Sequence, residues 1–400
     1  HPVAHSFPTR RSSDLVFVQN AELLNKFSKK TVDEFFLMVS IEEPLYPIQN
    51  LITYGKIQEK SAENRLPVPN HAKHCDPAII IFTSGSTGAP KGISFTHEQV
   101  TESCRSIIAA FPEIREESRF VCWLPLSNLF QRIINFCGIA VGATTYYVEN
   151  PREIMKHIST INPHIFLGVP RFYEKLYEGI VEEIKKRPLW IQKAVFLSFS
   201  IGEACAKAHQ QNRIPNITTR LLHKFADQII LKRLRATLGN SISFMISGSA
   251  PMPLWLLIKF QAMGLLILEA YGVSENIIPN ALNRLNAYEF GTVGKPLSPN
   301  QIKISHDGEV LVKGPGVFLG YLGENGLKTS FTEDGFLKTG DLGMIVEDGF
   351  LKLTGRKSEI FKTSTGRKIA PVSVEEKIRK ISYVEHADRK STRLNSSHYS

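Results

Sequence analysis

Thr83-Ser84-Gly85-Ser86-Thr87-Gly88-Ala89-Pro90-Lys91-Gly92 combines hydroxyl side chains, glycines and one lysine in a single short stretch. The apolar run 78–82 before it predicts a buried strand. A helix is predicted to open at Thr96, because Gln99 completes a capping box and apolar residues then recur at helical spacing. A loop between a strand and a helix can present backbone N–H groups and a helix N-terminus to an anion. We therefore predict a phosphate-binding loop here.

Two other kinds of loop have similar compositions. A Walker loop needs Gly-Lys-Ser/Thr at its end, whereas here Pro90 precedes Lys91 and Gly92 follows it. A flexible Gly/Ser linker is not normally bracketed by a buried strand and a capped helix. Lys91 could still be an ordinary surface lysine, whose single charge contributes little.

At these residues the chain resembles the AMP-forming acyl-adenylate superfamily, which includes acyl-CoA synthetases, luciferases and peptide-synthetase adenylation domains. The resemblance runs over residues 16–386 and rests on several motifs in the family's order. It implies an α/β fold: a large multi-subdomain adenylate-forming N-terminal domain with a β-rich subdomain, and a truncated C-terminal lid. It also implies that the loop contacts the ATP phosphates and that Thr87 and Lys91 are catalytic. The implied contacts are Thr83, Ser84, Gly85, Ser86, Thr87, Gly88 and Lys91.

Tyr271-Gly272-Val273-Ser274-Glu275 matches a second family motif. The resemblance implies that Tyr271 stacks on adenine with Gly272 beside it, that Ser274 contacts the α-phosphate, and that Glu275 is catalytic and holds Mg²⁺. A carboxylate suits a hard cation that also binds phosphates and water. Taken alone, the pentapeptide could equally be a strand end with a solvated glutamate. Upstream, Gly248-Ser249-Ala250 matches the segment that lines the adenine pocket, or is an ordinary strand-to-helix turn.

The ribose contacts are expected further along the chain. Thr339-Gly340-Asp341 matches a motif whose aspartate accepts hydrogen bonds from both ribose hydroxyls, a task for which one carboxylate has enough acceptor sites. By itself, Gly-Asp is more often only a turn. Arg356 matches a family arginine that also touches the ribose.

Residues between these motifs indicate a subclass. The segments 124–132 and 168–175 and a long helical insert over 181–238 look like those of long-chain acyl-CoA synthetases. Three positions depart from that pattern: the family usually has His at Asn128, Glu at Gln131, and Asp or Lys at Ser358. These departures bear on the acyl or CoA entrance and on the hinge. The predicted reaction is ATP-dependent formation of acyl-AMP from a long-chain fatty acid, followed by transfer to CoA.

Composition restricts the class further. The 400 residues are 42% hydrophobic and carry a formal net charge of +10. The five cysteines lack a C-x-x-C pair, so we predict neither disulfides nor zinc. The family resemblance implies ATP, Mg²⁺ and CoA as cofactors and co-substrates. Basic residues occur along the whole chain without a nucleic-acid motif, so we expect a cytoplasmic enzyme with peripheral contact to anionic membranes and no nucleic-acid partner. The longest apolar run, 254–267, is too short to span a bilayer and predicts a core helix leading to a strand.

Strand-like and helix-like segments alternate along most of the chain, which predicts an α/β architecture. From Gly291 onward the pattern changes to short strands and turns, which predicts a small β-rich subdomain, then a linker over 355–358. The predicted strands are 120–124, 143–148, 165–169, 243–247, 301–304, 309–312 and 350–353, and the predicted helices are 172–186, 221–238 and 373–381.

Both ends differ from the rest of the chain. Residues 5–15 and 388–398 resemble translated sequencing adapters, so we expect 1–15 and 388–400 to be artefacts. The expected natural parts are an N-terminally incomplete AMP-binding domain over 16–354 and a hinge with the start of a lid over 355–387. Because family lids carry an essential lysine that is absent here, we expect the fragment to be inactive. The alternatives are an adenylating enzyme that passes its acyl group to a carrier protein, and a nucleotide-binding protein without ligase activity.

Overall fold

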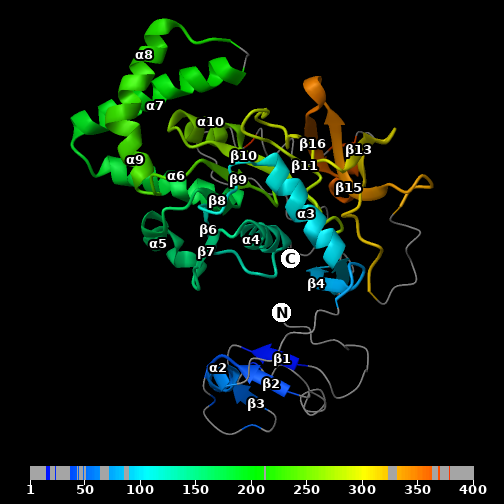
Figure 1. The fold of residues 1–400 in the computed structure, drawn as a ribbon. Coiled ribbons are helices and arrows are strands. Elements are labelled where there is room, and N and C mark those ends of the chain that lie inside the picture. Colours follow the sequence, from blue (N-terminus) through cyan, green and yellow to red (C-terminus); the bar gives the residue numbers. More distant parts are fainter. Residues whose placement is uncertain are drawn as a thin grey trace, which may run out of the picture. The chain divides into compact units, whose positions relative to one another are not determined.

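The computed structural model describes residues 15–18, 23, 37–42, 44, 48, 51–63, 72–84, 90–210, 213–322, 331–362, 368–369 and 378 (Figure 1). The chain divides into two compact units, His1–Ala72 and Lys73–Ser400. In the first unit, β1 (Leu15–Val18), β2 (Leu37–Ser40) and β3 (Leu51–Thr53) form a parallel sheet, and α2 (Tyr54–Glu63) follows β3. The other elements below belong to the second unit.

A mixed sheet forms the centre of the second unit. Its strands β8 (Ile165–Gly168), β9 (Phe244–Ser247) and β10 (Ile267–Tyr271) pair in parallel, and β11 (Ala281–Leu282) and β12 (Lys295–Pro296) add antiparallel at one edge. A separate parallel pair joins β6 (Arg119–Cys122) to β7 (Thr144–Tyr147). All residues of β8 and β9 are buried, as expected for parallel strands that are covered on both faces. The predicted α/β class and the four predicted strands in this region are confirmed.

Successive strand residues pack into different cores. Leu167 and Ile246 contact one apolar cluster that includes side chains of α3 (His97–Ala110) and α4 (Leu129–Val141). Phe166 and Met245 contact a second cluster on α5 (Ile154–Ile161), α6 (Pro170–Lys185), α7 (Leu189–Gln210) and α10 (Leu254–Ala262). Each buried Leu or Phe contributes about 1.5–3 kcal/mol, so the two clusters fix the helices on the sheet. The predicted core helix before β10 is α10.

Residues 90–92, the end of the predicted loop, belong to a strand that continues to Thr96. β4 (Pro77–Ser84) and β5 (Pro90–Thr96) form an antiparallel hairpin in which Ser84 pairs with Pro90 and Pro77 with Thr96. The alternating burial expected of a strand is present, because Ile93 and Phe95 are completely buried and Ser94 between them is less buried. The helix α3 begins after Thr96 with the predicted capping box, at the open end of the hairpin.

The predicted β-rich subdomain is a four-stranded antiparallel sheet of β13 (Gln301–Ile304), β14 (Glu309–Lys313), β15 (Leu337–Ile345) and β16 (Leu351–Arg356) (Figure 1). Gly355 and Arg356, predicted as linker, end β16 because they pair with Leu342 and Asp341. Only the following residues leave the sheet, through a short 3-10 turn, η6 (Lys357–Glu359). Short elements complete this description: η2 (Pro151–Glu153), η5 (Glu347–Gly349), β17 (Phe361–Lys362) and β18 (Lys368–Ile369).

The helical insert is present as predicted. After α6 the chain forms α7, α8 (Ile217–Ala226), a π-helical turn η3 (Asp227–Leu231) and α9 (Lys232–Ala236), all drawn in green in Figure 1. The predicted single helix 221–238 is therefore three consecutive segments. Of the helix predicted over 373–381, only Ile378 lies within the described residues. Among the described helices, none combines the length and apolar character that crossing a bilayer requires.

Candidate functional site

The structure brings together three predicted nucleotide-binding residues that are far apart in the sequence. Tyr271 ends β10, Asp341 lies on β15 and Arg356 ends β16. The Tyr271 hydroxyl donates a hydrogen bond to Asp341 Oδ2 over 2.7 Å. Arg356 Nε lies 3.2 Å from Asp341 Oδ1. The Asp341 side chain is 8% exposed and that of Arg356 64% exposed, so a buried carboxylate meets a guanidinium at the surface.

Burial dominates the electrostatics of this group. It raises the pKa of Asp341, although the Tyr271 hydrogen bond and the Arg356 charge oppose the shift and the nearby Glu275 and Glu309 carboxylates add to it. Burial, together with the Asp341 charge, also raises the pKa of Tyr271 far above its usual range. Tyr271 therefore acts as a hydrogen-bond donor at neutral pH, which fixes the orientation of the carboxylate.

A second set of charges holds the turn before Asp341. Gly340 has φ +73°, a conformation that glycine adopts without strain, and its N–H donates to Glu309 Oε1 over 3.0 Å. Lys357 Nζ lies 2.8 Å from both Glu309 Oε2 and Asp307 Oδ2. These carboxylates raise the pKa of Lys357, and Lys357 lowers that of Asp307. The turn before Asp341 is thus held by Glu309, whose ion-pair partner Lys357 directly follows Arg356 in the sequence.

Lys91 and Glu275 are linked by Tyr321, a residue that the sequence analysis missed. The Tyr321 hydroxyl donates to Glu275 Oε1 over 2.6 Å, and Lys91 Nζ lies 4.7 Å from the centre of the Tyr321 ring. Tyr321 is placed by an antiparallel bridge to Ile93 on β5. Because the hydrogen bond joins residues 46 positions apart, no local pattern could have revealed it.

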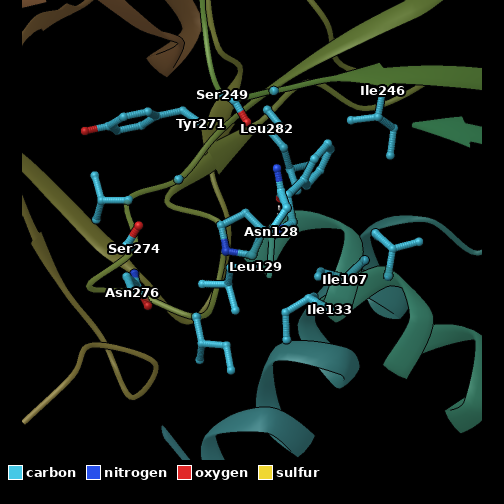
Figure 2. Close-up of a pocket in the computed structure, with 18 of the residues that line it drawn as sticks. Ile107, Asn128, Leu129, Ile133, Ile246, Ser249, Tyr271, Ser274, Asn276 and Leu282 are labelled. Carbon is cyan, nitrogen blue, oxygen red and sulfur yellow. Dashed lines mark hydrogen bonds between the residues drawn. The ribbon is translucent and has the colours of Figure 1, made fainter. Parts of the chain in front are cut away.

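A pocket of about 390 Å³ lies beside these groups (Figure 2). In Figure 2, Tyr271 and Ser274 lie toward one side of it and the apolar Ile107 and Ile133 toward the other. The predicted nucleotide residues that line it are Thr83, Gly248, Ser249, Tyr271, Gly272 and Ser274. Ala250 is exposed and is not among the lining residues. The cavity therefore has a polar side formed by β10 and its loop and an apolar side formed by α3 and α4.

Close packing shapes the predicted adenine segment. Ser249 has φ +71°, a left-handed conformation that is uncommon for a residue with a side chain. At Gly248, a Cβ atom would lie 3.4 Å from the Phe130 ring of α4, so the ring approaches the backbone closely. The Phe130 ring of α4 thus lies in van der Waals reach of the backbone at the end of β9.

Two of the departures from the family pattern have structural roles. Asn128 is the N-cap of α4, where its Oδ1 accepts the N–H of Phe130 over 3.0 Å, and it also lines the pocket. Gln131 is completely buried and does not line the pocket. Its Nε2 donates to Asn135 Oδ1 over 2.9 Å and to the Val121 carbonyl over 3.4 Å. Gln131 therefore ties α4 to β6, while Asn128 alone of the two touches the cavity.

Buried asparagines support the loop that follows Glu275, and the sequence analysis missed these too. Asn276 Nδ2 donates to Asn280 Oδ1 over 2.9 Å, and Asn300 Nδ2 donates to the Pro279 carbonyl over 2.9 Å. Asn276 Oδ1 in turn accepts the N–H of Ile278 over 3.2 Å. These bonds hold the backbone of the loop that carries Ser274 and Glu275.

The predicted phosphate loop is only partly open to description. Gly85, Ser86, Thr87 and Gly88 lie outside the described residues, and only the backbone of Ser84 is described. Thr83 faces the pocket, and its hydroxyl donates to the Lys91 carbonyl over 3.5 Å. The prediction that a helix N-terminus faces this loop is wrong. The hairpin places Thr96 at its opposite end, roughly 20 Å away at 3.3 Å per residue.

The donor set can be tested against ATP and Mg²⁺. A carboxylate has about four acceptor positions, and Tyr271 and Arg356 use two of those of Asp341, so acceptors for ribose hydroxyls remain. Glu275 offers one carboxylate, and within the described residues no three acidic, His or Cys side chains cluster as a metal site. That arrangement fits Mg²⁺ held mainly by phosphates and water. The described residues therefore fit both groups.

Comparisons with known proteins identify the family of the chain. A model of the AMP-binding enzyme family matches residues 13–322. The long-chain-fatty-acid–CoA ligase FadD15 of Mycobacterium bovis is 34% identical over 309 residues, which are 76% of this chain and 50% of the relative. Long-chain-fatty-acid–CoA ligase 5 of Rattus norvegicus is 30% identical over 330 residues, 77% of this chain and 46% of the relative. The chain thus spans about half the length of these curated relatives.

Solved structures share the fold. The anthranilate CoA ligase AuaEII in complex with anthranoyl-AMP has a TM-score of 0.66 at 20% identity, covering 94% of this chain and 65% of that chain. The o-succinylbenzoate CoA synthetase MenE of Bacillus subtilis, in complex with ATP and magnesium, has a TM-score of 0.61 at 20% identity, covering 91% and 73%. With the family match over most of its length, the chain belongs to the AMP-binding enzyme family.

Proposed function

We propose that this chain is part of an enzyme that activates a long-chain fatty acid with ATP to acyl-AMP and transfers the acyl group to CoA. The observation that carries the proposal is the cavity with two chemical sides, in which Tyr271 and Ser274 lie across from apolar side chains of α3 and α4 (Figure 2). Adenylation of a fatty acid needs a nucleotide next to an apolar channel. The names of the curated relatives support the same substrate class.

The residues have distinct proposed tasks. Asp341 accepts hydrogen bonds from the ribose while Tyr271 and Arg356 hold its carboxylate in place. Ser274 and the hairpin loop with Lys91 contact the phosphates, where a positive charge stabilises the pyrophosphate that leaves. Mg²⁺, when bound near Glu275, supplies charge neutralisation of the phosphates. The apolar side of the pocket, formed by α3 and α4, excludes water from the fatty-acid carboxylate that reacts.

Lys91→Ala, made in a version extended to the length of the curated relatives, tests the phosphate role. We expect turnover to fall about 10²-fold, as for the loss of one preorganised electrostatic contact, in an assay of fatty-acid-dependent pyrophosphate release. Lys352→Ala, at an exposed position of β16, is the matched control and should leave turnover unchanged. Unchanged turnover in Lys91→Ala would return Lys91 to the role of a surface lysine.

The same assay separates the alternative functions. Pyrophosphate release without acyl-CoA formation, but with acyl transfer to a carrier protein, would identify a carrier-dependent adenylating enzyme. AMP or ATP binding without any pyrophosphate release would identify a nucleotide-binding protein without ligase activity. In the proposed function, the lid that follows Arg356 rotates about Ser358 between the two half-reactions, and Ser358 lies exposed in the short turn η6.

A further inference from the structure

The helical insert exposes many large apolar side chains. Each of six such residues on α7 and α8 is more than half exposed: Trp190, Leu197, Ile217, Leu221, Leu222 and Phe225. A monomeric protein commonly exposes single apolar side chains, but their concentration on two helices that pack on each other points to an interaction surface. We call the exposed side chains of α7 and α8 the insert surface.

The geometry of α8 makes this exposure systematic. Asn216 caps the helix by accepting the Thr219 N–H over 2.8 Å, so the helix has a defined start. Of its ten residues only Ala226 is buried. Leu221 and Phe225 are four positions apart and therefore lie on one side of the helix. That side has no apolar cover from the part of the chain that the structure describes, since neither residue belongs to a described core cluster or packs against one.

Positive charges outnumber negative ones from α7 to α9. Residues 189–236 contain eight lysines and arginines but only two carboxylates, Glu203 and Asp227. Both carboxylates already have cationic partners, because Glu203 pairs with Lys259 and Asp227 with Arg235. Lys193 on α7 and Lys224 on α8 are exposed, with no ion pair to any described residue. The insert surface therefore combines apolar side chains with an excess of positive charge.

We propose that the insert surface docks on the surface of an anionic lipid bilayer. Exposed Leu, Phe and Trp side chains on a helix partition into the boundary between headgroups and acyl chains, and interleaved lysines are attracted to anionic headgroups. A second copy of the same surface is a poorer partner, because self-pairing places like charges opposite one another. Docking on lipid does not depend on ligase activity, so it can be measured without ATP, fatty acid or CoA.

Vesicle flotation of the full chain tests the proposal. We expect the chain to float with vesicles of phosphatidylcholine mixed with phosphatidylglycerol, to float less at high salt, and to bind pure phosphatidylcholine weakly. Leu221→Ser with Phe225→Ser should weaken partitioning at least about tenfold, because two apolar anchors are lost. Lys193→Glu with Lys224→Glu should also weaken it at least about tenfold, at about fivefold per charge removed, and should remove the preference for anionic vesicles.

Matched changes elsewhere serve as controls. Ile139→Ser alters an apolar residue that is 70% exposed on α4, and Lys338→Glu with Lys352→Glu reverses two exposed charges on β15 and β16. Both control variants should float like the parent, and thermal melting should show that all variants fold. The proposal is overturned if the parent does not float with anionic vesicles, or if the insert variants float as the controls do. A parent that is dimeric by sedimentation, with a monomeric Leu221→Ser, Phe225→Ser variant, would instead identify a self-association surface.

Discussion

At the scale of single residues, Asp341 has the most informative environment. Its carboxylate is buried, and its pKa is raised above the ordinary value of 3.8. A raised carboxyl pKa means that the folded state binds the proton more tightly than the unfolded state does. The stabilisation from protonated Asp341 is therefore fully present below pH 3.8 and is lost as pH rises through the raised pKa of the folded state.

Asp341→Asn tests this sign. Asparagine still accepts the Tyr271 hydrogen bond but does not titrate. The free energy of unfolding of the variant, relative to that of the parent, should therefore rise with pH and then level off. Urea unfolding over the acid range measures the difference. Asp334→Asn is the control with the opposite sign, because Lys303 lowers the pKa of Asp334 to about 2. Relative to Asp334→Asn, the parent should lose stability as pH falls. A flat difference for Asp341→Asn would contradict the role of burial.

At the residue scale, the family motifs name residues that meet in the structure, but they do not name partners that are remote in the sequence. Tyr271, Asp341 and Arg356 could be predicted through the family resemblance, and they meet in the structure. Tyr321 could not be predicted in this way. It contacts Lys91 and Glu275 because the bridge between Ile93 and Tyr321 places it beside them. Spatial adjacency of this kind leaves no periodic pattern in the chain.

At the scale of elements, the hairpin shows why residues 90–92, the end of the predicted loop, lie in a strand. Pro90 and Gly92 favour a loop, while Ile93 and Phe95 alternate with Ser94 as a strand requires. Short alternating segments are weak signals, and tertiary burial of Ile93 and Phe95 decides the outcome. By contrast, the capping box of α3 was predicted correctly, because its two hydrogen bonds are local.

The start of α4 gives a prediction at this scale. Asn128 caps the helix, so Asn128→Ala should cost about 1 kcal/mol of stability, whereas Asn128→Ser, which preserves a capping oxygen, should cost much less. Chemical unfolding of both variants measures the difference. Equal losses in the two variants would show that Asn128 contributes through the pocket wall and not through the cap. The departure from the family's histidine would then need another explanation.

At the scale of the whole molecule, the candidate nucleotide site joins two different sheets of the second unit. Tyr271 is the last residue of β10 in the mixed sheet, whereas Asp341 and Arg356 belong to the antiparallel sheet. A third apolar cluster, which includes Tyr271, Val310 and Leu351, packs the two sheets together. The sequence predicted both sheets from their strand patterns, but their contact depends on side chains from three distant segments and could not be predicted from any one of them.

This arrangement has a consequence for nucleotide binding. A ligand that touches both sheets stabilises both. At 100 times its Kd it raises the free energy of unfolding by about 2.7 kcal/mol, so amides that exchange through global unfolding exchange about 100-fold more slowly. We therefore expect saturating AMP to slow hydrogen exchange in β10 and in β15 and β16 together, as measured by mass spectrometry. The exposed helix α8, which contributes no residue to the pocket, is the internal control and should not change.

Asp341→Ala should remove the protection from both sheets at once, because the ribose contact is what couples them. Protection confined to β10, or protection in both sheets that survives Asp341→Ala, would show that the nucleotide does not bridge the two sheets through Asp341.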